Sequence, residues 1–115
     1  MSRILFVAAG AAALISAPAN ASPPTMLKCA IDTDSGPFLV NVTVDEANGF
    51  ATVHLPHSGF IQRRPAIFSA DLVKFSTSSV EYTLGRTDLA IRRRFSIGGA
   101  DSGKCVIEKT IPRKF

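Results

Sequence analysis

Apolar side chains recur at every second position through most of the chain after residue 25, and many of them are β-branched or aromatic. A spacing of two is typical of strands that bury one face, because successive side chains on a strand point to opposite sides. No stretch of ten residues in this part of the chain has the 3.6-residue spacing of a helix. The pattern therefore predicts an all-β domain.

The clearest hairpin joins residues 39–44 to residues 50–55 through the dipeptide Asn48-Gly49. Asn-Gly favours a two-residue turn, because both residues tolerate positive φ. With that turn, Val44 lies opposite Val53, and the apolar residues of both strands share one face.

A second hairpin is expected over residues 80–97. We expect Tyr82 to lie opposite Ile91 on the inner face, and Glu81 to lie opposite Arg92 on the outer face.

Three shorter segments complete the set of expected strands, at residues 66–69, 72–75 and 104–109. Seven or eight short antiparallel strands predict a small β-barrel or sandwich. Its interior would be filled by bulky aromatic side chains, which argues against a carrier cavity: Phe38, Phe60, Phe68, Phe75, Tyr82 and Phe95.

The first 21 residues have the three parts of a secretory signal peptide: Arg3, an apolar run over residues 4–15, and the small-residue site Ala19-Asn20-Ala21. As a helix the run is about 18 Å long, which is too short for a hydrocarbon core of roughly 30 Å. We therefore expect a signal peptide at 1–21, a flexible lead-in at 22–25 and a single β domain at 26–115. The mature protein would be periplasmic or secreted, without a transmembrane anchor.

The two cysteines, Cys29 and Cys105, lie near opposite ends of the expected domain. In an oxidising compartment they most simply form one disulfide. Closing so long a loop stabilises the fold by about 4 kcal/mol in the chain-entropy model.

Charge and candidate chemistry narrow the function only a little. Removal of the leader with Arg3 lowers the formal net charge from +4 to +3, which is too mild for a nucleic-acid-binding protein. His54 and His57 are better explained as exposed polar residues than as metal ligands, and the acidic pair Asp32 and Asp34 as part of a turn. With no nucleophile motif either, we expect no enzyme activity, no metal and no cofactor.

The basic residues form the one unusual cluster. In the run Arg92-Arg93-Arg94, strand geometry points Arg92 and Arg94 outward and Arg93 toward the apolar side. Arg63-Arg64 is expected in a loop.

Two interpretations of these arginines stay open. One is a solvated strand face with Arg92 paired to Glu81. The other is a patch for an anionic surface such as lipid headgroups, polysaccharide or an acidic protein, formed by Arg63, Arg64, Arg92 and Arg94.

Short motifs give the chain two resemblances. It resembles small exported bacterial proteins of unknown function, through the following elements: Cys29, Val44-Asp45-Glu46, residues 72–75 and 82–86, and Gly103-Lys104-Cys105. It is also similar to periplasmic inhibitors of C-type lysozyme, which are small β-barrels with cysteines near both ends. Their Ser-Gly-x-x-Tyr stretch is matched by residues 78–82, with Ser79 in place of the glycine.

From these features we expect an exported, monomeric, non-enzymatic β domain with a binding or envelope-associated structural role. Its partner would be an unidentified protein or an anionic envelope component. The alternative, implied by the second resemblance, is a periplasmic inhibitor of a host or bacterial enzyme.

The signal peptide leads to a direct prediction. Exported protein should begin at Ser22, because the small-residue site and the length of the apolar run agree on cleavage after Ala21. Intact-mass measurement of exported material checks this, and a mass that still includes residues 1–21 would contradict it.

Overall fold

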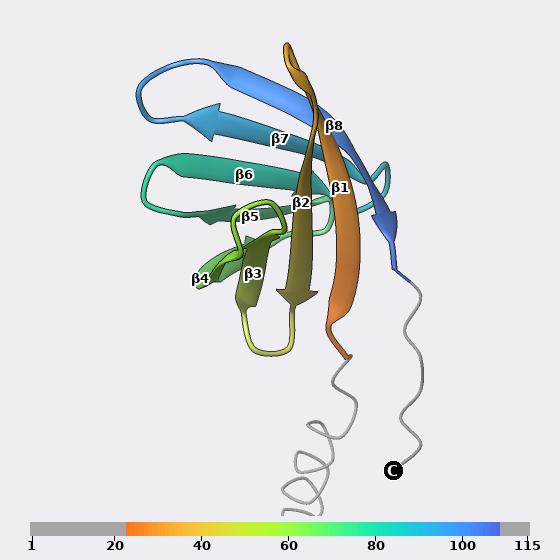
Figure 1. The fold of residues 1–115 in the computed structure, drawn as a ribbon. Helices are drawn as coiled ribbons and strands as arrows, with labels where there is room; N and C mark the ends of the chain where they lie inside the picture. Colours follow the sequence, from red (N-terminus) through yellow and green to blue (C-terminus); the bar gives the residue numbers. More distant parts are fainter. Residues whose placement is uncertain (1–22, 109–115) are drawn as a thin grey trace, which may run out of the picture.

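Eight antiparallel strands form a closed barrel in the computed structural model, which describes residues 23–108 (Figure 1). The strands are β1 (Thr25–Thr33), β2 (Gly36–Asp45), β3 (Phe50–Leu55), β4 (Phe60–Phe68), β5 (Leu72–Ser76), β6 (Val80–Gly85), β7 (Ala90–Phe95) and β8 (Ala100–Ile107). The predicted all-β class and strand number are confirmed, and of the two expected architectures the chain adopts the barrel. The expected signal peptide lies outside the described residues.

Each strand pairs with the next along the chain, and β1 pairs with β8 to close the barrel. Figure 1 shows β1 and β8 side by side, with the start of β1 and the end of β8 at the same end of the barrel. At this seam Cys29 lies directly opposite Cys105, and the two form the predicted disulfide. The covalent bond thus joins the first and last strands at their point of closure.

The core consists of the inward-pointing side chains of the strands. Its buried apolar members are Leu27, Cys29, Ile31, Val40, Val42, Ala51, Val53, Val73, Phe75, Tyr82, Leu84, Ile91 and Cys105. The rings of Phe75 and Tyr82 stack with their centres 5.0 Å apart. Of the aromatic residues expected inside, Phe38, Phe68 and Phe95 are half-buried, whereas Phe60 is 42 % exposed and does not belong to the core.

The first hairpin has the expected faces but a different register. Val53 lies opposite Val42, not opposite Val44. The turn is longer than the predicted Asn-Gly pair, because Gly49 (φ 74°) donates its N–H to the carbonyl of Asp45 at 2.9 Å. Because side chains alternate with a period of two, a shift of two residues leaves the same side chains inside.

The second hairpin differs in the same way. Tyr82 lies opposite Arg93, not opposite Ile91. Leu89 adopts a left-handed φ of 57°, and its carbonyl accepts the N–H of Cys105 at 2.8 Å. This residue therefore belongs to the loop and bonds toward β8, which moves the start of β7 along the chain.

The expected loop at Arg63 and Arg64 is wrong, because both residues lie within β4. A proline inside a strand is tolerated only where its missing N–H leaves no gap in the ladder. Ala66 donates its N–H to Gly49 on the β3 side, so the nitrogen of Pro65 points to the other side. There, pairing with β5 begins only at Ala66.

The remaining strands lie where the sequence predicts them, but their lengths differ from the predicted ones. The segments expected at 66–69 and 72–75 correspond to the end of β4 and to β5. The last strand, expected at 104–109, runs instead from Ala100 to Ile107, because its pairing with β7 already starts at Ala100.

Closure of the barrel requires a glycine at position 103. A Cβ added to Gly103 would lie 2.6 Å from the Cα of Ile31 and closer still to the carbonyl oxygen of Ala30. Both are backbone atoms of β1, so neither can move without opening the seam. Replacement of Gly103 by alanine should lower the free energy of unfolding by about 3 kcal/mol, as overpacking does.

Urea denaturation checks this prediction. Ser102→Ala is the matched control, because Ser102 is an exposed neighbour on the same strand and its variant should unfold within about 0.5 kcal/mol of the unmodified protein. Equal stability of the two variants would contradict the close approach of β1 and β8.

Candidate functional site

The outer side of β5, β6 and β7 carries a row of polar and basic side chains. The register places Lys74 opposite Thr83, and Thr83 opposite Arg92. In the next row Glu81 lies opposite Arg94. Arg92 and Arg94 are both exposed, which confirms their predicted outward direction.

The ion pair on this surface differs from the expected one. Arg94, rather than Arg92, contacts Glu81, with 2.8 Å between its Nη2 and the carboxylate. This follows from the shifted register of the second hairpin. Over residues 23–108, Arg92 and Lys74 make no ion pair, so their charges are available to a partner.

Arg64 belongs to the same surface, and Arg63 does not. A shallow depression lined by Arg64, Lys74 and Glu81 adjoins a second one lined by Lys74, Glu81, Arg92 and Arg94. Arg63 instead places its guanidinium 3.9 Å from the centre of the Phe50 ring. We call the four cations Arg64, Lys74, Arg92 and Arg94 the basic face.

Lys74 is the member of the basic face that sequence reasoning missed. The signal was present in the alternation of residues 72–75, where Val73 and Phe75 are buried and Lys74 is exposed. What the sequence lacked was the pairing of β5 with β6, which brings Lys74 to the arginines.

The basic face is a local excess of charge on a balanced barrel. Residues 23–108 contain nine Lys and Arg and nine Asp and Glu. Glu81 is the one acidic residue that lines the two depressions of the basic face. The basic face therefore carries a local excess of positive charge, although the described residues sum to zero.

Arg93 points inward, as predicted, and is only 8 % exposed. Its Nε and Nη2 donate to the two carboxylate oxygens of Asp101 at 2.9 and 2.7 Å. The guanidinium also lies 4.6 Å from the Phe38 ring centre and 5.0 Å from that of Phe95. These contacts make Arg93 a part of the barrel interior, since a buried charge needs such partners.

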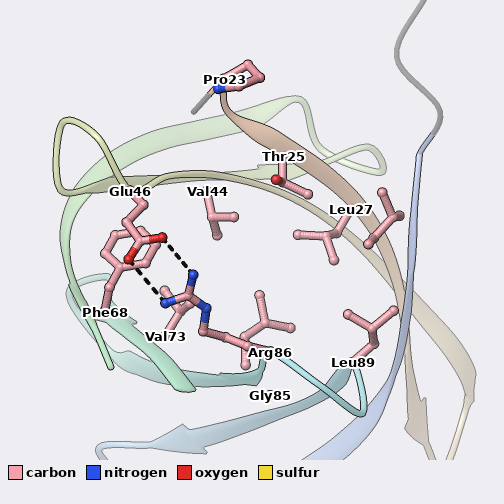
Figure 2. A pocket seen from close by; sticks show the side chains of 12 residues that line it. Pro23, Thr25, Leu27, Val44, Glu46, Phe68, Val73, Gly85, Arg86 and Leu89 are labelled. Carbon is pink, nitrogen blue, oxygen red and sulfur yellow. Dashed lines mark hydrogen bonds and ion pairs between the residues drawn. The ribbon is translucent and has the colours of Figure 1, made fainter. Parts of the chain in front are cut away.

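A cavity of about 270 Å³ opens at the end of the barrel where β1 begins (Figure 2). Its lining is mostly apolar: Pro23, Thr25, Leu27, Val44, Glu46, Phe68, Val73, Leu84, Gly85, Arg86, Leu89 and Ile107. We call it the mouth cavity. The expectation that aromatic side chains fill the barrel interior is therefore wrong at this end.

One ion pair borders the mouth cavity. Arg86, in the β6–β7 loop, and Glu46, in the β2–β3 loop, face each other in Figure 2 with 2.6 Å between Nη2 and Oε1. Nη1 of Arg86 also donates to the carbonyl of Ser69 at 2.7 Å. The hydrogen bond from Arg86 lowers the pKa of Glu46, and the same bond raises the pKa of Arg86.

The backbone around Arg86 explains how this side chain is held. Its N–H donates to the carbonyl of Asp71 at 2.8 Å. The preceding Gly85 is buried, and a Cβ there would meet the side chain of Asp88. Sequence reasoning missed the pair because Glu46 and Arg86 are 40 residues apart and both lie in loops, where no periodicity marks them.

The two histidines are not brought together with other ligands. His54 Nδ1 lies 3.5 Å from the side-chain amide of Asn41, and the ring of His57 lies 6.3 Å from that of Phe38. In the part of the chain that the structure describes, no three His, Cys, Asp or Glu side chains gather where they could hold a metal ion.

Comparison of the chain with protein-family models, curated proteins and solved structures found no match in any of the three. The resemblances proposed from short motifs therefore stay predictions.

Tyr82 offers a direct test of the barrel interior, because it is the only tyrosine of the chain. Burial raises the pKa of its phenol above 10.0, and the nearby charge of Arg93 opposes part of that rise. The unfolded tyrosine ionises near pH 10 while the folded one stays neutral, so the free energy of unfolding should fall as the pH rises through this range.

Phenolate absorbance measures the titration of Tyr82 alone, and urea denaturation against pH measures its effect on stability. Tyr82→Phe is the control, because it removes the phenol. The free energy of unfolding of this variant should keep only the pH dependence that the lysines contribute. A phenol that titrates at or below 10 in the folded protein would contradict the buried position.

Proposed function

We propose that this chain is an exported, non-enzymatic binding domain that adheres to an anionic surface of the cell envelope through its basic face. The observation that carries the proposal is a local excess of cations. Lys74, Arg92 and Arg94 stand beside a single carboxylate on the outer face, and Arg64 lines the adjoining depression, although charges over residues 23–108 balance.

The chemistry of the basic face suits phosphate or carboxylate groups. Guanidinium groups donate paired hydrogen bonds to such groups, and a lysine ammonium adds a compact charge. Lys74 and Arg92 stand in one row across the sheet, on either side of Thr83, so their positions are set by backbone pairing. A cationic surface of this kind, spread over strands β4 to β7, fits a partner that presents many anions side by side.

Two exposed apolar side chains favour lipid headgroups over a sugar polymer. Ile67, which is 73 % exposed, lies opposite Lys74, and Leu72, 36 % exposed, lines the same depression as Arg92. Apolar side chains among cations suit the boundary between headgroups and acyl chains. The anionic surface is therefore that of a membrane leaflet.

The compartment rests on two features. The apolar leader suggests export, and a disulfide such as that between Cys29 and Cys105 forms and persists in an oxidising compartment such as the periplasm. Over residues 23–108 there is no helix of the length and apolar character needed to cross a membrane. The attachment that we propose is through the basic face.

Co-sedimentation with vesicles tests the proposal. The protein should bind vesicles of phosphatidylcholine that contain phosphatidylglycerol, and should bind less as salt shortens the screening length to about 8 Å. Lys74→Gln combined with Arg92→Gln should weaken binding about 30-fold, since each cation near an anionic membrane contributes about 1 kcal/mol. Thermal unfolding should barely change, because both side chains are exposed.

A control makes the vesicle experiment specific. Arg63→Gln removes an arginine outside the basic face, and this variant should bind like the unmodified protein. Equal binding by all variants would contradict a role of the basic face. Binding to acidic polysaccharide without binding to vesicles would reject the membrane.

A further inference from the structure

We propose that the mouth cavity is a second binding site, which takes a small amphiphile with one carboxylate. The apolar body of the ligand would lie among the inward side chains at the end of the barrel, and its carboxylate would bind Arg86. This site is separate from the basic face, because none of its lining residues belongs to that surface.

The size and lining of the cavity suit a small apolar group. Its volume of about 270 Å³ is near the lower end of small-molecule pockets, which span about 300–1,000 Å³. Leu27, Val44, Val73, Leu84 and Leu89 all line it, and Figure 2 shows Leu27, Val44, Val73 and Leu89 around a common space. A short hydrocarbon chain fits a cavity of this size and lining.

The polar part of the site is the guanidinium of Arg86, the one cation among the lining residues. Of its five N–H donors, those on Nη1 and Nη2 bind the two oxygens of Glu46 and the carbonyl of Ser69. Within residues 23–108 the Nε–H donates no hydrogen bond. Arg86 therefore has donor capacity left for a ligand oxygen at the border of an apolar space.

The carboxylate of Glu46 competes with the ligand carboxylate for the guanidinium of Arg86. Its side chain is 52 % exposed, against 32 % for that of Arg86, and it comes from the turn between β2 and β3. An exposed ion pair contributes little to stability, so Glu46 can turn into water when a ligand carboxylate replaces it. Arg86 meanwhile keeps its bond to Ser69 and its place 5.8 Å from the Phe68 ring centre.

This arrangement predicts opposite effects for the two halves of the ion pair. Glu46→Gln removes the competing carboxylate and should tighten binding of an anionic amphiphile. Arg86→Gln removes the charged donor and should weaken it about tenfold, the usual effect of losing a hydrogen bond to a charged group. A ligand that carried a cation would show the reverse order.

Titration of the full chain with octanoate, followed by amide chemical shifts and by calorimetry, tests the proposal. Saturable shifts are expected at Val44, Leu84 and Leu89, with octan-1-ol binding more weakly than octanoate because it lacks the charge. Arg63→Gln, which changes a residue outside the lining of the mouth cavity, should bind octanoate like the unmodified protein. Vesicle binding through the basic face should be unaffected by Arg86→Gln, which separates the two sites.

Three results would overturn the proposal. The first is the absence of saturable shifts at the lining residues with millimolar octanoate. The second is equal binding of octanoate and octan-1-ol in the unmodified protein. The third is weaker octanoate binding by Glu46→Gln, which would show that Glu46 rather than Arg86 holds the polar group.

Discussion

The pairing of β1 with β8 is the constraint on which the rest of this small barrel depends. A meander of eight strands leaves two edges open unless its first and last strands meet. Here they meet in register, with Cys29 bonded to Cys105 and Gly103 against the backbone of Ala30 and Ile31. Every other strand then has neighbours on both sides, and the inward side chains form one continuous core.

Closure also makes the two ends of the barrel different. Near the β7–β8 turn, Arg93 and Asp101 fill the interior as a hydrogen-bonded pair beside the rings of Phe38 and Phe95. At the opposite end, Arg86 and Glu46 form their pair at the border of a cavity. Both pairs join an arginine to a carboxylate, and the first is much more deeply buried than the second. Burial makes the first pair structural, and the exposure of the second is what our proposal of a ligand site at Arg86 depends on.

Strand geometry gives the three consecutive arginines of β7 two separate roles. Arg93 points into the barrel, whereas Arg92 and Arg94 point out of it. On the outer side Glu81 neutralises Arg94, so the excess charge of the basic face comes from Arg92 together with Lys74 and Arg64. The same alternation that buries one arginine thus exposes its neighbours to solvent.

The sequence by itself determined the all-β class, the strand count, the inner and outer faces and the cysteine pair. Each of these follows from a period of two or from composition, which are local properties of the chain. Tertiary structure decided the registers of the two hairpins. Gly49 and Leu89 lengthen their turns through backbone hydrogen bonds that the hydrophobic pattern does not predict. It also decided both candidate sites, since Lys74 reaches the arginines through strand pairing, and Glu46 meets Arg86 across 40 residues of sequence only when the barrel closes.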